Sequence, residues 1–322
     1  MPDDVRLFLR KLLIFSLPVW LYVAVVAAVD PYDALGTGLV GDEIKLQTAY
    51  KLNYALWKLA RYRRDPRPLI LLGDSRMMEL PADSVTARAG MPCANLAYGG
   101  GSLREAIDTF WYATGRTRLR EVCFGVGTTV FNDSERKDRV SEARACLRNP
   151  LLYLININVV RSTAMILTAL VTGQEYHIGV PTMTPEQFWQ HQLGRTARAA
   201  YTAYRYPRKY LDELSVVADY CRRNDIRLTF VVFPRHRDLR RLAAEMGLAE
   251  QEKRLREDLA ALGEVFDLDY DNAITRDRSR FRDPFHFKES VVTIVLDSVW
   301  GDDRRWVRVV GDGRPGGGTN HG

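Results

Sequence analysis

The N-terminal part of the sequence contains a segment that can cross a membrane. Leu12 to Val29 is a run of 18 residues without a charge. Three basic residues precede it, Arg6, Arg10 and Lys11. A helix of this length just crosses the hydrocarbon core of a bilayer, which is about 30 Å thick. Basic residues on the N-terminal side predict that the N-terminus stays in the cytoplasm. The sequence therefore predicts a single-pass protein of the inner (cytoplasmic) membrane, with its main domain in the periplasm or on the extracellular side.

Two other interpretations of this run stay open. The tripeptide Val26-Ala27-Ala28 resembles a cleavage site, so the run could belong to a cleaved signal peptide. The apolar region of a signal peptide is usually about 7–15 residues long, and the greater length found here favours a retained anchor. A helix buried in a protein core is less favoured, because the run is apolar on all sides.

The remaining chain has the composition of a folded protein and divides into segments of different character. Apolar residues make up 46% of the sequence and charged residues 27%, as in globular domains. A helical pattern over Lys45–Arg64 ends in a basic stretch and is stopped by Asp65-Pro66. The predicted segments are an anchor (1–30), a linker with a basic helix (31–66), a main domain (67–302) and a flexible, glycine-rich tail (303–322).

The main domain alternates predicted strands with predicted helices. This alternation predicts an α/β fold with a parallel sheet that is covered on both faces. Ligands in such sheets bind at the carboxyl ends of the strands. The predicted strands are Leu69–Leu72, Cys93–Ala97, Glu121–Val126, Leu228–Phe233 and Val265–Leu268, and the main predicted helices are Leu103–Thr114, Tyr210–Arg223, Asp238–Leu262 and Phe287–Trp300.

A mostly helical insertion from about residue 134 to 208 interrupts the alternation. It contains Leu151–Val171, which is nearly apolar apart from two asparagines, Arg161 and a few hydroxyl residues. A second membrane span is conceivable, but a central arginine makes it energetically costly. The favoured prediction is a cap helix over the active-site edge of the sheet, with a membrane-touching face as the alternative.

A serine follows the first strand of the main domain. The apolar run Leu69–Leu72 ends in Gly73-Asp74-Ser75, so the Ser75 hydroxyl should project from the edge of the sheet at the start of a helix. In that position it can act as a nucleophile if a base accepts its proton. The alternative is that Asp74 and Ser75 only cap this helix.

An aspartate and a histidine three residues apart, Asp283 and His286, lie before the last helix. One helical turn would place both side chains on the same face. Asp283 could then accept a hydrogen bond from Nδ1 of the imidazole, while Nε2 faces the serine. Ser75, His286 and Asp283 are therefore predicted to form a catalytic triad. The other four of the five histidines are interpreted as surface, packing or tail residues.

A turn of three glycines, Gly99-Gly100-Gly101, follows the second strand. A glycine has no side chain to block its own N–H, so Gly100 can approach a bound acyl oxygen closely. Together with the backbone N–H of Ser75, it is predicted to form an oxyanion hole. Such turns also occur simply as tight turns.

These motifs resemble the blocks of the SGNH (GDSL-type) hydrolase superfamily. Gly73-Asp74-Ser75 matches the nucleophile block, Asn95–Gly100 resembles the second block, and Asp283–His286 matches the D-x-x-H block. Together they bracket roughly residues 68–300. The resemblance implies a flavodoxin-like, three-layer α/β/α sandwich and Ser-His-Asp acyl-transfer chemistry, with Gly100 as the oxyanion glycine.

One block departs from the family pattern. The third block of the superfamily carries a Gly-x-Asn-Asp motif whose asparagine donates to the oxyanion. The corresponding stretch here is Gly125–Thr129, and Asn132-Asp133 follows several residues later. Thr128 or Asn132 is therefore expected to supply the third donor, unless the oxyanion hole has two donors and is slower.

A narrower resemblance comes from the order of the N-terminal features. An anchor, Asp30-Pro31-Tyr32, a basic helix and the strand before Ser75 are arranged as in membrane-anchored SGNH proteins that work beside MBOAT acyltransferases. These include the alginate O-acetylation proteins and the Dlt-type D-alanylation protein of teichoic acids. The resemblance implies an MBOAT-type partner that delivers an acyl group across the membrane, and an envelope polysaccharide that accepts it.

Several other classes of protein are disfavoured. No HExxH motif, Cys/His metal motif or phosphate loop is present, so neither a metal nor a cofactor is expected. The net charge of +6 comes from scattered arginines that would lie outside the cytoplasm, which disfavours a nucleic-acid partner. The four cysteines have no CxxC spacing, and a Cys146–Cys221 disulfide would be permitted but has no support from the spacing.

Three functions remain for this sequence. The favoured one is an anchored O-acyltransferase that passes an acetyl or D-alanyl type of group through acyl-Ser75 to an envelope polysaccharide. The second is an esterase or lipase, in which water resolves the same intermediate. The third is a catalytically idle scaffold of an envelope complex.

Overall fold

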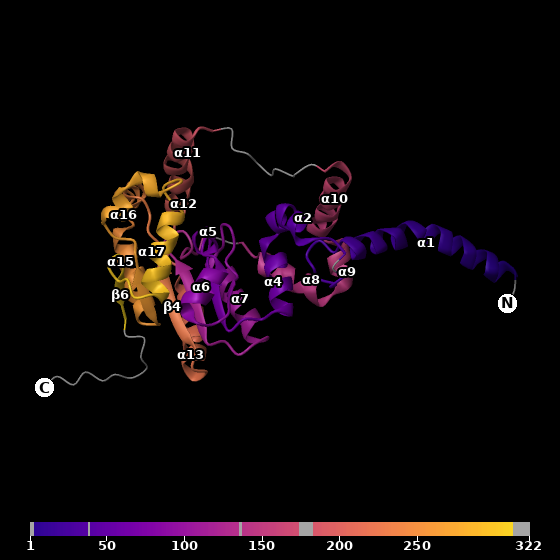
Figure 1. Ribbon diagram of the computed structural model, residues 1–322, viewed down its shortest axis with the longest axis horizontal. Coiled ribbons are helices and arrows are strands. Elements are labelled where there is room, and N and C mark those ends of the chain that lie inside the picture. Colours follow the sequence, from indigo (N-terminus) through magenta and orange to yellow (C-terminus); the bar gives the residue numbers. More distant parts are fainter. Residues whose placement is uncertain (1–2, 38, 135–136, 174–182, 312–322) are drawn as a thin grey trace. The chain divides into compact units, whose positions relative to one another are not determined.

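The computed structural model describes residues 3–37, 39–134, 137–173 and 183–311 (Figure 1). The chain forms two compact units, and each is assembled from two separate segments. Unit 1 comprises Met1–Arg64 and Ser141–Val180, and unit 2 comprises Asp65–Val140 and Pro181–Gly322. The insertion predicted from about 134 to 208 is therefore divided between the units.

Unit 2 contains a six-stranded sheet with the order β2-β1-β3-β4-β5-β6. Neighbouring strands from β2 to β5 are parallel, and β6 is antiparallel to β5. This confirms the predicted α/β class, and the order 2-1-3-4-5 is that of flavodoxin-like sheets. The strands are β1 (Leu69–Leu72), β2 (Cys93–Asn95), β3 (Glu121–Val126), β4 (Arg227–Val232), β5 (Glu264–Asp267) and β6 (Arg308–Val310).

The sequence patterns did not predict β6. It consists of three exposed residues at the edge of the sheet, without the buried apolar run that marks the other strands. It lies inside the stretch 303–322 that was predicted to be a flexible tail, so the first part of that stretch instead completes the sheet. Residues 312–322 lie outside the described part of the chain.

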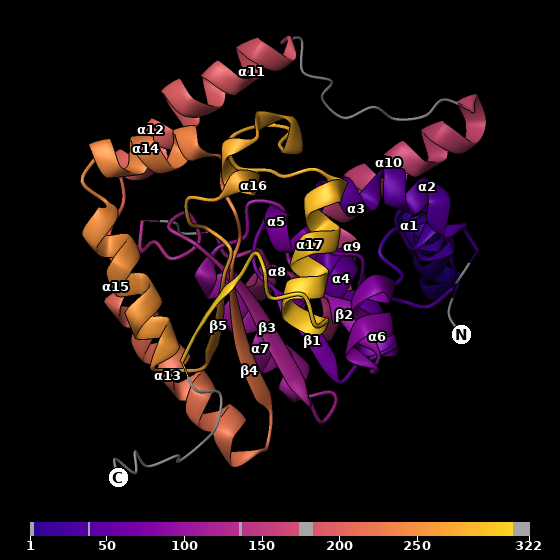
Figure 2. The ribbon, with the colours of Figure 1, turned by 60° about the vertical axis from the view of Figure 1, so that its left-hand side comes forward.

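Helices cover both faces of the sheet (Figure 2). On one face, Leu69 and Leu71 of β1 share a core with Val85 of α6 and Val295 of α17. On the other face, Phe124 of β3 lies against Phe110 of α7. The covering helices are α6 (Ala82–Ala89) and α17 (Glu289–Trp300) on the first face, and α7 (Leu103–Thr114), α13 (Arg208–Arg223) and α15 (Ala249–Ala260) on the second.

Local sequence signals set several helix boundaries. Helix α7 begins with a capping box, in which the Ser102 hydroxyl accepts from the Glu105 N–H and the Glu105 carboxylate accepts from the Ser102 N–H. The single helix predicted over Asp238–Leu262 is two helices, α14 (Arg237–Glu245) and α15. They are separated at Gly247, whose φ of +77° suits glycine and ends a helix.

The other short elements of unit 2 lie in its loops and in the second part of the insertion. They are α5 (Ser75–Met78), α11 (Pro185–His191), a π-helical turn (Gln192–Ala197), α12 (Arg198–Thr202), α16 (Ala273–Arg276) and a 3₁₀ turn (Arg278–Arg280).

Unit 1 is helical. Within the described residues, α1 is the one helix long and apolar enough to cross a membrane. The helix predicted over Lys45–Arg64 is broken at Thr48 and Asn53 into three. The helices are α1 (Asp3–Val29), α2 (Asp42–Gln47), α3 (Ala49–Leu52), α4 (Tyr54–Arg64), most of α8 (Arg139–Arg148), α9 (Pro150–Ile155) and α10 (Ile157–Thr172).

A buried cluster joins the end of α1 to α9 and α10. The fully buried carboxylate of Asp30 accepts hydrogen bonds from the backbone N–H groups of residues 34, 35 and 36 and from the Tyr153 hydroxyl. The Tyr32 hydroxyl lies 2.9 Å from the hydroxyl of Ser162 on α10. Because a buried carboxylate is costly without such partners, this cluster fixes how the chain leaves α1.

The four cysteines are buried and free. The Cys146–Cys221 pairing that the sequence permitted is therefore not formed.

Candidate active site

The structure brings Ser75, His286 and Asp283 together in unit 2. The Ser75 Oγ lies 2.7 Å from Nε2 of His286, and Nδ1 of His286 lies 2.8 Å from Oδ2 of Asp283. Both distances are those of hydrogen bonds. Ser75 and His286 are partly exposed, whereas Asp283 is buried. The serine and the histidine can therefore meet a substrate, and the carboxylate stays away from water.

The loop after β1 holds Ser75 in place. Gly73 has a φ of +149°, and a Cβ atom on it would lie 2.9 Å from the carbonyl oxygen of Gly125. Asp74 caps α5 by accepting a hydrogen bond from the Arg76 N–H. The alternative that Asp74 and Ser75 cap the helix is therefore correct for Asp74. Ser75 is the first residue of α5, and its side chain is directed to His286.

A turn, and not the expected helical turn, places His286 beside Asp283. Oδ1 of Asp283 accepts from the backbone N–H of Phe285 at 2.8 Å and of His286 at 3.1 Å. This leaves Oδ2 for the imidazole. Burial raises the pKa of the Asp283 carboxyl, but the hydrogen bond and charge of His286 and the two backbone donors outweigh it, so the pKa is lowered. The ionised form is the one that can orient and stabilise an imidazolium.

Neighbouring loops fix this turn. The His236 N–H, which follows β4, donates to the carbonyl oxygen of Pro284 at 3.1 Å. The Arg282 N–H donates to the carbonyl oxygen of His286 at 2.8 Å. The first bond ties the turn to the loop after β4, and the second closes the turn, which limits the positions available to the imidazole.

The glycine turn after β2 lies against the loop that carries Ser75. The Tyr98 N–H donates to the Gly73 carbonyl oxygen at 3.0 Å, and Gly100 has a φ of +57°. Within the described part of the chain, the backbone N–H groups of Ser75 and Gly100 have no hydrogen-bond partner. Two such donors on adjoining loops are what an oxyanion hole requires.

Replacing Gly101 with alanine is expected to disturb this arrangement. A Cβ atom on Gly101 would lie 2.6 Å from the Gly73 carbonyl oxygen and 3.0 Å from the Tyr98 carbonyl oxygen, so the two loops must separate. Urea unfolding of the Gly101→Ala protein should show a loss of about 1–3 kcal/mol, as for other overpacked sites.

The matched control for this prediction is Gly115→Ala, at the end of α7. Its Cβ atom would meet only carbonyl oxygens at 3.8 and 4.0 Å, which are ordinary contacts. Equal stability of the two variants would mean that the glycine turn does not pack against the Ser75 loop as described.

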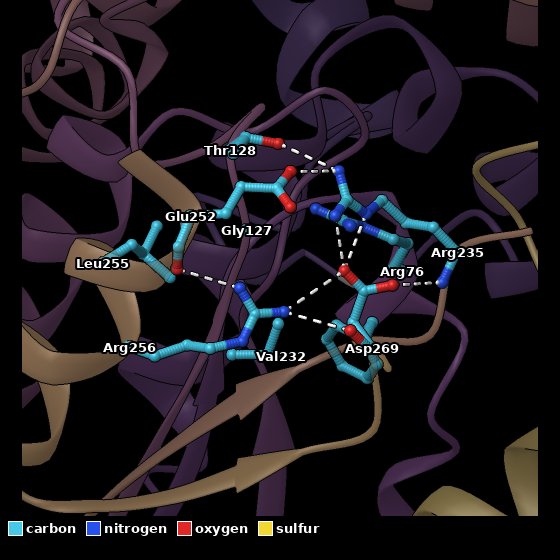
Figure 3. A pocket seen from close by; sticks show the side chains of 10 residues that line it. Arg76, Gly127, Thr128, Val232, Arg235, Glu252, Leu255, Arg256 and Asp269 are labelled. Carbon is cyan, nitrogen blue, oxygen red and sulfur yellow. Dashed lines mark hydrogen bonds and ion pairs between the residues drawn. The ribbon is translucent and has the colours of Figure 1, made fainter. Parts of the chain in front are cut away.

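Thr128 and Asn132, the predicted third donors, accept hydrogen bonds from other residues. The Thr128 hydroxyl oxygen accepts from Arg235 Nη1 at 3.3 Å (Figure 3). Oδ1 of Asn132 accepts from the N–H and hydroxyl of Ser134 and from the Arg205 N–H. Among the described residues, neither side chain contacts Ser75. These contacts use the acceptor oxygens and not the donor groups, so a donor role for either stays a prediction.

A buried network of charges lies at the carboxyl ends of β3, β4 and β5 (Figure 3). Arg235 contacts Asp269, Glu252 and Thr128, and Arg256 contacts Asp269. Burial opposes both charges of the central pair, but their mutual attraction prevails, so the pKa of Asp269 is lowered and that of Arg235 is raised. The space among these side chains is about 10 Å³ and holds at most a water molecule. The network therefore joins the loops instead of binding a ligand.

Sequence reasoning missed Arg76 and the pair of Glu105 and Arg139. The buried Arg76 guanidinium pairs with Asp74 and donates to Thr129, so it links the loops after β1 and β3. The Arg139 guanidinium pairs with Glu105 and donates to the carbonyl oxygen of Gly99. An arginine directly after the serine was a visible signal, whereas nothing in the sequence links Glu105 to a residue 34 positions away.

No group of three or more His, Cys, Asp or Glu side chains that could hold a metal ion occurs in the described ranges.

Comparisons with known proteins give only distant likenesses. No protein-family model matches the sequence, and no curated protein matches it significantly. The chain is similar to a solved structure provisionally described as a platelet activating factor from Streptococcus pneumoniae, with a TM-score of 0.42 and 9% identity over 79% of this chain and 91% of that one. It is also similar to a provisionally described acylhydrolase from Bacteroides fragilis, with a TM-score of 0.39 and 7% identity over 77% of this chain and 93% of that one. At this level of similarity, the function is inferred from the side chains of the site.

Proposed function

We propose that this protein is a membrane-anchored serine acyltransferase that works outside the cytoplasm. The observation that carries the proposal is the continuous hydrogen-bonded chain from the Ser75 hydroxyl through His286 to the buried Asp283 carboxylate. In an idle scaffold, nothing would maintain the Ser75–His286 and His286–Asp283 distances below 3 Å. The N–H groups of Ser75 and Gly100, on adjoining loops and without a partner among the described residues, add the second feature that acyl transfer needs.

The chemistry follows from these positions. The Ser75 Oγ attacks the carbonyl carbon of an acyl donor, and its proton passes to Nε2 of His286. The N–H groups of Ser75 and Gly100 stabilise the negative oxygen of the tetrahedral intermediate. His286 then protonates the leaving group, and acyl-Ser75 remains. An acceptor hydroxyl attacks the acyl-enzyme with His286 again as base, which transfers the acyl group and regenerates Ser75.

The four charged residues of a hollow lined by residues that follow α5 and precede Asp283 support a polar acceptor. An open hollow of about 370 Å³ is lined by Glu79, Arg282, Lys288 and Glu289, with Pro81 and Val292 as its apolar part. Arg282 directly precedes Asp283, and Glu79 directly follows α5. Carboxylates and basic groups can hydrogen-bond sugar hydroxyls, whereas a lipid chain would require an apolar pocket. We therefore prefer an envelope polysaccharide over a lipid ester, and transfer over hydrolysis.

The anchor sets the place of this reaction. If α1 spans the inner membrane with its N-terminus in the cytoplasm, the chain leaves the membrane on the outer side, and unit 2 lies outside the cytoplasm. Activated acyl donors are made in the cytoplasm, so an acyl group of the acetyl or D-alanyl type must be brought across. A multi-spanning MBOAT-type partner is the proposed source, and it would present the acyl group to Ser75.

The test uses the full chain in lipid nanodiscs with p-nitrophenyl acetate as donor, with and without an acetyl-free oligosaccharide as acceptor. Mass spectrometry of the protein should find one acetyl group, on the peptide that contains Ser75. Mass spectrometry of the products should find acetylated oligosaccharide, formed at the expense of free acetate. These two results together would support the transferase.

Other results would change the conclusion. Acetate release that is unaffected by the oligosaccharide would identify an esterase that uses the same triad. A wild-type protein that releases no p-nitrophenol and carries no acetyl group would contradict the proposal. The catalytically idle scaffold would then be the remaining function. The unmodified oligosaccharide incubated with donor alone serves as the control for uncatalysed acetylation.

A further inference from the structure

Helix α1 is exposed along most of its length but covered at its C-terminal end. Among its last residues, Val26 is fully buried and Val29 is 4% exposed. The covering groups belong to unit 1 itself: α1 packs against α10, and the Tyr22 hydroxyl donates to the carbonyl oxygen of Leu154 in α9. Figure 1 shows α9 beside this end of α1.

The covered end of α1 is needed to cross a bilayer. The last charge before the apolar run is Lys11, and the run ends at Val29. At about 1.5 Å per residue, the 18 residues span about 27 Å, close to the roughly 30 Å of a hydrocarbon core. If the segment from Tyr22 onward lay outside the membrane, the remaining 10 residues would span only about 15 Å.

The position of α9 relative to the membrane follows. Tyr22 lies seven residues before Val29, which is about 10 Å along the helix axis. Because the Tyr22 hydroxyl binds the Leu154 carbonyl, α9 is at a similar depth below the outer boundary of the hydrocarbon core. Whatever packs against the last turns of a membrane-spanning α1 must itself lie within the bilayer.

We propose that α9 and α10 are embedded in the outer leaflet of the bilayer, beside α1, and contact lipid directly. This rests on the part of the proposed function that makes α1 a retained anchor. The partner of this surface is therefore phospholipid, and the chain has a second membrane contact that does not cross the bilayer.

The composition of the outward face of α9 and α10 fits lipid. Between Pro150 and Gly173, Arg161 is the only charged residue. Its long side chain can reach the head groups while its Cα stays lower. Soluble proteins rarely expose apolar patches of this extent. The exposed large apolar residues, named here the apolar face, are Leu151, Leu152, Ile155, Ile157, Val160, Leu167, Leu170 and Val171.

Three polar side chains on these helices or at the break between them are hydrogen-bonded within the protein, which lowers the cost of a lipid environment. At the break between the helices, the Asn156 side chain accepts from the N–H groups of Asn158 and Val159 and donates to Glu142. The exposed hydroxyls of Thr168 and Thr172 donate to carbonyl oxygens of their own helix, at 2.9 and 2.8 Å. Such bonding lets a hydroxyl face lipid at little cost.

The cluster at the end of α1 makes the arrangement rigid. Tyr153 of α9 binds Asp30, and Ser162 of α10 binds Tyr32. Both helices are therefore fixed to the chain within three residues of the last residue of α1, Val29. The apolar face cannot leave the membrane without breaking this cluster or withdrawing α1.

Spin labels on single introduced cysteines test the proposal in the full chain in nanodiscs. The native cysteines are buried, and the unmutated chain measures their background labelling. Labels at Ile155 and Val171 report on the apolar face, and both positions are exposed, at 73% and 86%. A label at Phe15 reports on α1, and one at Val216 on α13 of unit 2 is the aqueous control. The measurement is accessibility to oxygen, which concentrates in lipid, and to a water-soluble nickel complex.

We expect the ratio of oxygen to nickel accessibility at Ile155 and Val171 to match that at Phe15 and to exceed that at Val216 several-fold. Labels at these two sites that behave like Val216, with Phe15 in lipid, would overturn the proposal. Labels closed to both reagents would also overturn it, because a protein would then cover the face. A water-exposed Phe15 would overturn the anchor itself and this inference with it, while leaving the acyl-transfer test unaffected.

Discussion

The Ser75→Ala protein is expected to lose acetyl transfer from p-nitrophenyl acetate by at least about 10³-fold in kcat. The reason is that the Ser75 Oγ lies 2.7 Å from Nε2 of His286, and no other hydroxyl or thiol in the described residues is hydrogen-bonded to this nitrogen. The side chain is partly exposed, so its removal leaves no buried cavity, and the fold should be retained. Single-turnover kinetics with the full chain in nanodiscs measure the effect, and the acetyl group on the Ser75 peptide should disappear.

The matched control is Ser215→Ala on α13. The Ser215 hydroxyl donates only to the Leu211 carbonyl of its own helix, so its loss should leave kcat unchanged. Circular dichroism of both variants checks folding. Residual activity of the Ser75→Ala protein within about tenfold of wild type would refute the nucleophile assignment, since the oxyanion donors alone cannot sustain that rate.

The Asp283→Asn protein should lose activity by about 10⁴-fold while its structure changes little. Oδ1 of the side chain can still accept from the N–H groups of Phe285 and His286. The amide nitrogen that replaces Oδ2 donates to Nδ1 of His286, which forces the proton onto Nε2. A protonated Nε2 cannot accept the proton of Ser75, so the base is held in the wrong tautomer. The kcat for acetyl transfer measures this loss.

Stability against pH provides a second measurement on the same variant. The pKa of Asp283 is lower in the folded chain than its ordinary value of about 3.9, so the ionised carboxylate contributes stability above that value. This contribution is lost as the pH falls through the folded pKa. The difference in free energy of unfolding between wild type and Asp283→Asn should therefore shrink below about pH 4. Asp219→Asn, with a largely exposed side chain on α13, is the control and should preserve both kcat and the pH dependence.

The strands and the site were predictable where one local rule decides the structure. The apolar run Leu69–Leu72 and the capping box at Ser102 gave β1 and the start of α7 without error. Ser75 follows strand β1, and the Asp283–His286 turn precedes helix α17. The parallel topology therefore predicted that these residues would lie close together at the edge of the sheet. The D-x-x-H turn differs from the expected helical turn because Asp283 binds two backbone N–H groups of its own loop.

Other features depended on contacts between distant residues. The patterns could not show that Thr128 would be turned toward Arg235, 107 positions away. The patterns also could not show that the predicted insertion belongs partly to each unit. That division depends on contacts such as the hydrogen bond between Asp30 and Tyr153, which are 123 residues apart. Strand β6 was missed for a different reason: an exposed edge strand of three residues has no buried face to reveal it.

The interleaving of the two units has a consequence for synthesis. Neither unit is a continuous stretch of chain, so neither can finish folding before part of the other has emerged. Helix α1 is made first, but the segment that contains Tyr153 and covers its end follows more than a hundred residues later. At about 5–20 residues per second, Tyr153 follows Asp30 after about 6–25 seconds. Until β4 is made, the half-built sheet with β1 to β3 exposes a strand edge. A chaperone that binds exposed strand edges would therefore find its substrate in this early chain.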